Sequence, residues 1–293
     1  AYGLLRAERC WRQVRAADPD SPVTPLWLRC VVMVLWLALA GSLLALLGAG
    51  IGSTGFESVL NARHDPLAWQ IVMDIRLPRT AAALLAGGLL GLAGAIAQGV
   101  FRNPLADPYL LGSASGASLG VALAMAALGV SPFALAGLAR WGVTGAAFVG
   151  AVVAVVLTLV LAKGVQNTMR LLLAGVVVGV VLGAAASLVL LMNPDIIQAM
   201  QSFMLGSTAF AGWNACALML WVLLPTLALS WCLSRVLDGL ALGESTAHSL
   251  GLPLGPLRLL LFVLLALATG TAVAQTGLIA FVGLASPHLV RSM

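Results

Sequence analysis

Few side chains in this 293-residue chain are of the types that do catalytic or metal chemistry. The three histidines, His64, His248 and His288, lie far apart along the chain, so a shared metal or haem site is not indicated. The cysteines lack the paired spacing of metal sites, and we interpret them as small apolar side chains. They are Cys10, Cys30, Cys216 and Cys232. No Ser, His and Asp residues form a recognisable triad, so we expect no catalytic residue, no metal and no cofactor in this chain.

The chain also lacks the loop with which ATPases hold phosphate. That loop reads GxxxxGK followed by Ser or Thr, because its glycines let backbone N–H groups surround the phosphates and its lysine reaches them. The only lysine here, Lys163, is followed by Gly164. We therefore expect no ATPase site, and any energy from a nucleotide has to come from a partner.

The composition is that of a protein embedded in lipid. Hydrophobic residues make up 61% of the chain and charged residues 9%, with a mean hydropathy of +1.06, whereas soluble domains carry roughly 25% charged residues. Long apolar runs in lipid must be helical, because a helix satisfies its own backbone groups. We predict an all-α polytopic membrane protein. Its net charge of +5 comes mainly from loop arginines, so nucleic acid is not an expected partner.

Seven apolar runs approach the ~20 residues needed to cross ~30 Å of hydrocarbon. They cover residues 26–50, 81–100, 113–129, 142–162, 171–192, 211–233 and 257–274. An eighth begins at Gly277, and the sequence stops at Met293 before the run is complete. We expect seven spans and the start of an eighth, in a transmembrane domain over residues 26–293.

Residues 1–25 form a polar, basic leader in which four arginines recur every three residues. That spacing places them on one helical face, which suits either a membrane surface or a merely solvated tail. With the leader inside, eleven Lys and Arg residues are cytoplasmic and four are outside. The inside set is Arg6, Arg9, Arg12, Arg15, Arg29, Arg102, Lys163, Arg170, Arg235, Arg258 and Arg291, and the outside set is Arg63, Arg76, Arg79 and Arg140. This excess predicts a cytoplasmic N-terminus.

Two further segments are helical but too short or too polar to span. Outside, Asn193, Pro194 and Asp195 are typical of a helix start, with Asn193 as the cap, and Gly206 ends the segment. We predict a half-helix that dips in from the outer face. Inside, residues 240–252 form a short cytoplasmic helix with a polar GESTAHS centre, closed by Gly251.

The stretch QGVFRNPLADPYLLGSASGASLG, residues 98–120, predicts a tight hairpin between two spans. Asn and Asp before proline start turns, because the proline ring disfavours a helical preceding residue. The turn residues are Asn103, Pro104, Asp107 and Pro108. Glycines at spacings of four follow in two spans, namely Gly112, Gly116, Gly120, Gly175, Gly179 and Gly183. Such spacing indicates close helix packing, with a sliding or gating face on the pathway as the alternative.

Four blocks of the sequence resemble the permease subunits of the ABC importers for iron-siderophore, haem and cobalamin. They are RLPRTAAALLAGGLLGLAGAIAQGVFRNPLADPYLLGSASGASLG (76–120), RLLLAGVVVG (170–179), LGESTAHSLGL (242–252) and GLIAFVGLASPHLVR (277–291). The family fold is an all-helical subunit of about ten spans, so the resemblance implies further spans beyond those of this sequence. It also implies a homodimer, two ATPase subunits on the cytoplasmic side that hold ATP and Mg, and a periplasmic substrate-binding protein above a bacterial inner membrane.

The resemblance also implies roles for individual residues. Residues 242–252 resemble the loop that docks into the ATPase, which makes the expected coupling residues Gly243, Glu244, Ala247, Leu250 and Gly251. Arg76 and Arg79 resemble arginines that pair with acidic residues of the binding protein, or they anchor the helix end. The short cytoplasmic gate of the family falls here on Asn167, Thr168 and Met169.

The expected function is therefore that of a permease that moves an iron chelate (haem or siderophore) or cobalamin from periplasm to cytoplasm by alternating access, driven by a partner ATPase. An ion-coupled secondary carrier for a small solute is the alternative. It predicts acidic or histidine residues at mid-span, and the seven runs carry no charge away from their ends. The choice among the three cargoes is left open by motifs that all three kinds of permease share.

Overall fold

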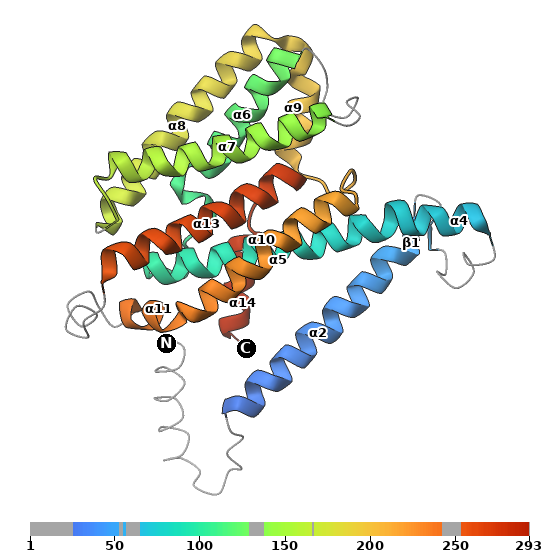
Figure 1. Cartoon of the computed structure of the whole chain (residues 1–293), viewed down its shortest axis with the longest axis horizontal. Coiled ribbons are helices and arrows are strands. Elements are labelled where there is room, and N and C mark those ends of the chain that lie inside the picture. Colours follow the sequence, from blue (N-terminus) through green and yellow to red (C-terminus); the bar gives the residue numbers. More distant parts are fainter. Residues whose placement is uncertain are drawn as a thin grey trace, which may run out of the picture. The chain divides into compact units, whose positions relative to one another are not determined.

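The computed structural model describes residues 26–52, 55–56, 65–128, 138–165, 167–241 and 253–292, and almost all of them are helical (Figure 1). The chain divides into two compact units. The first comprises residues 1–77 with 289–293, and the second comprises Pro78–His288.

The first unit contains a long apolar helix and a short β pair. Helix α2 (Leu26–Gly50) is followed by strands β1 (Ile51–Gly52) and β2 (Gly55–Phe56), which pair antiparallel. Helix α4 (Pro66–Ile71) then begins with proline in its first turn, and the Asp65 carboxylate accepts a hydrogen bond from the Leu67 N–H at 3.0 Å. It continues into a π-helical turn, η1 (Val72–Arg76).

The second unit contains most of the spans. Its elements are α5 (Leu77–Phe101), η2 (Pro108–Leu111), α6 (Ser113–Leu128), α7 (Leu138–Leu161), α8 (Thr168–Met192), η3 (Pro194–Ile196), α9 (Ile197–Leu205), α10 (Trp213–Cys232), α11 (Ser234–Ala241), α13 (Leu254–Thr276) and α14 (Val282–Ser292). Every predicted apolar run is a helix, so the all-helical membrane fold is confirmed. Among the described residues, six helices are long and apolar enough to cross a membrane. The 16-residue α6 reaches only about 24 Å.

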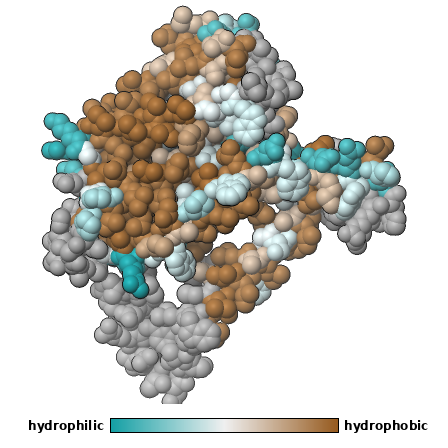
Figure 2. Space-filling view, in the orientation of Figure 1, coloured by the Kyte–Doolittle hydropathy of each residue, from teal (hydrophilic) through white to brown (hydrophobic). Residues whose placement is uncertain are grey.

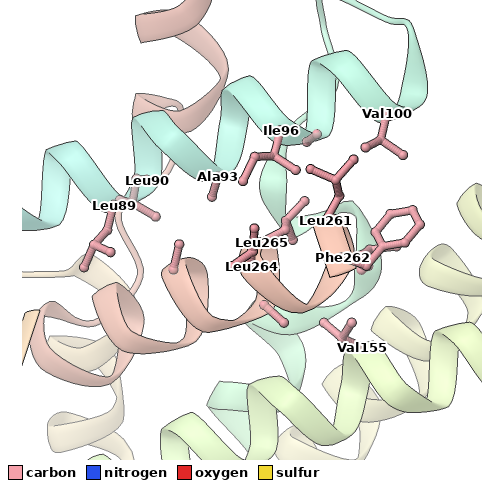
Figure 3. Packing of buried hydrophobic residues seen from close by; sticks show 14 of the residues in the cluster. Leu89, Leu90, Ala93, Ile96, Val100, Val155, Leu261, Phe262, Leu264 and Leu265 are labelled. Atoms are coloured by element: carbon pink, nitrogen blue, oxygen red, sulfur yellow. The ribbon is translucent and has the colours of Figure 1, made fainter. Parts of the chain in front are cut away.

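The core of the second unit lies between α5 and α13. Figure 3 shows Leu89, Ala93 and Ile96 of α5 directed at Leu261 and Leu265 of α13. All five side chains are at most 1% exposed. At one end of this contact the rings of Phe101 and Phe262 meet with centroids 5.8 Å apart. Since lipid is as apolar as leucine, it is close packing that holds these helices together.

The outer surface is apolar, as lipid requires. Figure 2 shows hydrophobic residues over most of the visible face. Large side chains such as Leu191, Trp221 and Trp231 are more than three quarters exposed, at 77%, 80% and 79%. In water such exposure would cost free energy, but in hydrocarbon it costs none.

The predicted short helix is present and begins at the expected residues. The 3₁₀ turn η3 starts at Pro194 and leads into α9, and Gly206, with a positive φ of 65°, follows as the C-cap of α9. Asn193 occupies the N-cap position of η3, but its side chain makes no capping hydrogen bond there. Its side-chain amide instead donates to the Val189 carbonyl at 2.9 Å, because the preceding helix α8 offers an unpaired C-terminal acceptor.

The helix that contains Arg76 and Arg79 also differs from expectation. We placed both arginines before a span that begins at residue 81, but the helix runs without interruption from Pro66 to Phe101. The expected cytoplasmic helix over residues 240–252 is described only at its first residues. Helix α11 ends at Ala241, and residues 242–252 lie outside the described part of the chain.

Candidate functional site

Two glycine turns from distant parts of the chain are joined through their backbones. Gly206 is the C-cap of α9, and Gly277, with a φ of 73°, is the C-cap of α13. The Ser207 N–H donates to the Thr276 carbonyl at 2.7 Å, and the Leu278 N–H donates to the Phe203 carbonyl at 3.0 Å. Non-helical backbone at membrane depth survives only where protein groups satisfy it. The α9 turn therefore stabilises the interruption between α13 and α14.

We call residues Gly277 to Phe281 the α13–α14 break. On its other side it is held by the hairpin that follows α5. The Tyr109 hydroxyl donates to the Ile279 carbonyl at 3.2 Å, and the Gln98 amide donates to the Leu284 carbonyl, just past the break, at 3.0 Å. Hydrogen bonds at and beside the break thus join α5, η2, α9, α13 and α14.

The hairpin itself turns at the residues that the sequence singled out. The Asn103 carboxamide oxygen accepts from the Leu105 N–H at 2.9 Å, and the Asp107 carboxylate accepts from the Tyr109 N–H at 2.7 Å. Pro108 is the first residue of η2, and Gly112 follows it in the left-handed region at φ 78°. The Asn103 and Asp107 side chains therefore each form an Asx turn, in which the side-chain oxygen accepts from a backbone N–H two residues later. This hydrogen bond is the reason that Asn and Asp start turns.

Asp107 is half-buried in this hairpin. Burial raises the pKa of its carboxyl group from 3.8, because the charged form loses hydration, and the hydrogen bond from the Tyr109 N–H partly opposes this shift. A raised folded-state pKa means that the carboxyl group stabilises the fold most when it is protonated. That contribution is lost as the pH rises through the folded-state pKa.

We therefore expect Asp107→Asn to be at least as stable as the wild type at neutral pH, since asparagine keeps the turn without a charge. The difference should shrink as the pH falls towards 3.8. Asp107→Ala should lose about 1 kcal/mol of unfolding free energy, at neutral pH and near pH 3.8 alike, because the side-chain acceptor of the turn is gone. Thermal unfolding in detergent across this pH range measures both effects. An asparagine variant that is less stable than the alanine variant would contradict the assignment.

The spaced glycines lie at backbone contacts. A Cβ at Gly116 would overlap the Gly150 carbonyl of α7, and one at Gly120 would overlap the Ala146 carbonyl. A Cβ at Gly175 of α8 would overlap the Leu110 carbonyl of η2. The remaining glycines have looser surroundings: a Cβ at Gly112 would lie 3.3 Å from the Gly179 nitrogen, and a Cβ at Gly179 or Gly183 would lie 3.7 or 3.9 Å from the Ser115 hydroxyl. This geometry supports the close-packing interpretation.

The arginines proposed to dock the binding protein differ in exposure. Arg79 is exposed, whereas Arg76 is only 9% exposed and is engaged in an interaction within the chain. A bidentate pair with a carboxylate of another protein requires an accessible guanidinium. Arg79 is thus the better placed of the two.

The residues that we assigned to a gate begin α8. Asn167 is its N-cap, and its side-chain oxygen accepts from the Arg170 N–H at 3.1 Å. Thr168 is half-buried and Met169 is 65% exposed. Just before them, α7 ends in a Schellman motif in which the Gly164 N–H donates to the Leu159 carbonyl at 3.0 Å, with Lys163 and Gly164 at positive φ. Asn167 therefore has a structural role whether or not this segment gates.

The expected coupling residues, Gly243, Glu244, Ala247, Leu250 and Gly251, all lie outside the described residues. A buried arginine shortly after them was missed by the sequence reasoning. We counted Arg258 among the cytoplasmic charges, at the start of the run over residues 257–274, but it is only 2% exposed within α13. The apolar face formed by Leu254, Leu261 and Phe262, at spacings of three and four from Arg258, was the signal that would have placed it.

Two small cavities lie among α6, α7, α9, α10 and α13. One of about 140 Å³ is lined by residues that include Met125, Phe203 and Phe210, and one of about 270 Å³ by Trp141, Trp213 and Asn214. Thr144 and Gln275 border both. Pockets for drug-sized ligands measure roughly 300–1,000 Å³, so neither cavity accommodates a tetrapyrrole.

The described residues contain no cluster of His, Cys, Asp or Glu that could hold a metal ion. Pro287 is buried in α14, and the neighbouring His288 is exposed. The chemistry of the described region is therefore that of hydrogen-bonded and apolar packing.

Comparison with known proteins gives consistent matches over most of the chain. The profile of the FecCD transport family matches residues 30–293. The hemin transport system permease protein HmuU of Yersinia pestis is 38% identical over 267 residues, which are 89% of this chain and 78% of that protein. The vitamin B12 import system permease protein BtuC of Salmonella typhi is 38% identical over 233 residues, which are 79% of this chain and 68% of that protein.

A solved structure supports the same relationship at the level of the fold. It is an inward-facing conformation of a metal-chelate type ABC transporter, similar to this chain with a TM-score of 0.77 and 27% sequence identity. The match covers 88% of this chain and 80% of the other.

Proposed function

This chain belongs to the FecCD transport family, and we propose that it is the membrane permease of an ATP-driven importer that brings haem, another iron chelate or a cobalamin into the cytoplasm. The observation that carries the proposal is the match of the family profile over residues 30–293, supported by relatives that import hemin and vitamin B12. The chain forms a multi-pass membrane protein, and translocation rather than covalent chemistry is its task.

The partners are inferred from membership of the family and from the similarity to an ABC transporter. ATP and Mg are then held by two ATPase subunits on the cytoplasmic side, which agrees with a sequence in which Lys163 is not part of a phosphate-binding loop. The pathway runs between two copies of the permease in a homodimer. A periplasmic binding protein delivers the cargo, with Arg79 as a contact.

Orientation completes the proposal. The excess of basic residues supports a cytoplasmic N-terminus, and the bacterial relatives support a location in the inner membrane of a bacterial cell. Residues 242–252 are then cytoplasmic and available to the ATPase. The ion-coupled carrier is not favoured, because the similar solved structure is an ABC transporter and the runs carry no charge at mid-span.

The test is to reconstitute the permease with its cognate ATPase and binding protein. Cargo-loaded binding protein should stimulate ATP hydrolysis, and cargo should accumulate only with ATP. Thermal stabilisation of the binding protein by haem, a ferric siderophore or cobalamin identifies the cargo. Uptake by the permease alone, driven by a proton or sodium gradient, would overturn the proposal.

The coupling assignment predicts a specific loss. Glu244→Ala should release the ATPase from affinity-tagged permease, or abolish cargo-stimulated hydrolysis, because the segment loses its contact with the ATPase. Asp195→Ala is the matched control, since it also removes a carboxylate, an exposed one that the proposed orientation places on the opposite side of the membrane. Equal ATPase retention and stimulation in the two variants would contradict the role of Glu244.

A further inference from the structure

Two tryptophans and an unpaired amide border the larger of the two cavities. It is lined by Trp141 and Thr144 of α7, by residues 212–215 at the start of α10, and by Gln275 of α13. The smaller cavity adjoins it, since Thr144 and Gln275 border both. We call the larger cavity the tryptophan pocket.

The tryptophan pocket lies at one edge of the hydrocarbon layer. Trp141 and Trp213 are the first residues of their candidate spans, and Gln275 is the last residue but one of the span formed by α13. Helices α7 and α10 therefore begin, and α13 ends, at the same membrane face. Tryptophan is enriched at this depth because its ring is apolar and its N–H is polar. An occupant of the pocket would lie at the depth of lipid headgroups.

The amide of Gln275 is the feature that points to an occupant. Its Nε2 is covered from solvent, and no atom of the described residues accepts a hydrogen bond from it. Leaving a buried amide unpaired costs free energy that leucine at this position would not cost. Because the terminal torsion of glutamine is soft, the amide can turn its N–H towards either adjoining cavity.

The backbone that carries Gln275 is held firmly. The Gly277 N–H donates to the Val273 carbonyl at 2.8 Å, and the Thr276 carbonyl accepts from the Ser207 N–H at 2.7 Å. The amide is therefore presented from a fixed position, which is what a binding group requires.

The polar groups of the tryptophan pocket are uncharged. They are the Thr144 hydroxyl and the amides of Asn214 and Gln275, and none of the described lining residues is Asp, Glu, Lys, Arg or His. A phosphate or an ammonium group would find no opposite charge among these residues, and burying an unpaired charge is costly. An ammonium group also offers no acceptor to the Gln275 N–H. Uncharged hydroxyl oxygens satisfy both conditions.

The tryptophans add apolar surface beside these polar groups. Trp141 is 48% exposed and Trp213 is 52% exposed, so about half of each side chain is free to cover an occupant. A sugar ring suits such a pocket, because its C–H faces are apolar and its hydroxyls both donate and accept. The volume of about 270 Å³ lies just below the roughly 300–1,000 Å³ of pockets for drug-sized ligands, so it suits a single ring.

We propose that the tryptophan pocket binds an uncharged, hydroxyl-bearing ring, such as the sugar headgroup of a glycolipid. The Gln275 N–H donates to a ring hydroxyl, the indoles of Trp141 and Trp213 cover the C–H faces, and the Thr144 and Asn214 side chains bind further hydroxyls. A free sugar has the same chemistry, and the experiment below separates the two sources. The ligand is distinct from the imported cargo, so the inference does not rest on the proposed function.

The experiment measures binding to the whole permease in phosphatidylcholine nanodiscs, prepared without glycoside detergents. The probes are a monoglucosyl diacylglycerol, free glucose, and phosphatidylethanolamine as a charged comparison. Gln275→Leu removes the amide, and Trp213→Leu removes one indole. Their matched controls are Gln198→Leu on α9 and Trp221→Leu on α10, both of exposed residues that line neither cavity. Thermal unfolding at rising probe concentration gives the affinity.

We expect the glucolipid to stabilise the wild type and both controls alike, and to bind Gln275→Leu and Trp213→Leu about tenfold more weakly. Without a probe, Gln275→Leu should be at least as stable as the wild type, because an unpaired amide is gone, so its weaker binding would not reflect misfolding. Tighter binding of the glucolipid than of glucose identifies a lipid as the source, and equal affinities identify a free sugar.

Three results would overturn the inference. They are binding of neither glucose probe, stronger binding of phosphatidylethanolamine than of the glucolipid, and equal affinity of the wild type, Gln275→Leu and Trp213→Leu for the glucose probes. If one of the two pocket variants does not fold, the other decides the question by the same comparison with its control.

Discussion

Replacing Gly94 with alanine is expected to prevent this permease from accumulating in a folded state. Gly94 lies on α5, where a Cβ would overlap the Gly283 carbonyl of α14 and approach Gly283 Cα at 3.0 Å. The obstacle is backbone, which cannot rotate away as a side chain can. Overpacking of this kind costs about 3 kcal/mol or more, which is a large part of the stability of a typical protein.

The same helix offers matched controls for this prediction. A Cβ at Gly87 would meet nothing within 4 Å, so Gly87→Ala should be tolerated and should gain up to about 1 kcal/mol of helix propensity. Gly91 is intermediate, because its Cβ would meet the rotatable Ser286 hydroxyl at 2.9 Å. Membrane abundance and thermal unfolding in detergent should rank the variants Gly87, Gly91, Gly94 in falling order. A Gly94→Ala protein as abundant as Gly87→Ala would show that α5 and α14 are not in backbone contact.

Replacing Gly277 with alanine is the second change for which we expect a large loss. Its φ of 73° and ψ of −164° lie in a region that only glycine adopts readily, and strain there costs about 1–3 kcal/mol. A Cβ would in addition overlap the Phe203 carbonyl, which accepts the Leu278 N–H. The backbone strain and the overlap both act on the α13–α14 break. We therefore expect the hydrogen bonds between the α9 turn and the break to be lost, and uptake with them.

Gly212→Ala is the control for that substitution. Gly212 lies in the connection between α9 and α10, has an extended backbone with a φ of −101°, and would place a Cβ in open space. Uptake and protease accessibility of α9 should be unchanged in Gly212→Ala and strongly altered in Gly277→Ala. Normal uptake by Gly277→Ala would mean that the break does not need its observed geometry.

The helices of this protein could be predicted because lipid leaves the backbone few choices. Each apolar run became a helix, and Gly206 ended α9 at the expected residue. The Asx turns at Asn103 and Asp107 were equally predictable, since their hydrogen bonds reach only two residues along the chain. Local chemistry determines all of these features.

Contacts between distant segments could not be predicted in the same way. The Asn193 amide turned back to Val189 because α8 continued to Met192 and left an acceptor within reach. The hydrogen-bond partners of Gln98 and Tyr109 could not be predicted from the sequence, because the carbonyls that accept from them lie 186 and 170 residues further along the chain. Arg258 was missed for the same reason, since its acceptor lies 93 residues earlier in the chain.

Helix α13 has a consequence for how the protein is made. Its most apolar window is 67% buried, and its neighbours include α5, α7 and α10. A span that buries so much of its surface against other helices depends on their presence, which is the second stage of two-stage membrane folding. Helices α5, α7 and α10 leave the ribosome before α13, so this dependent span arrives when its partners are already in the membrane.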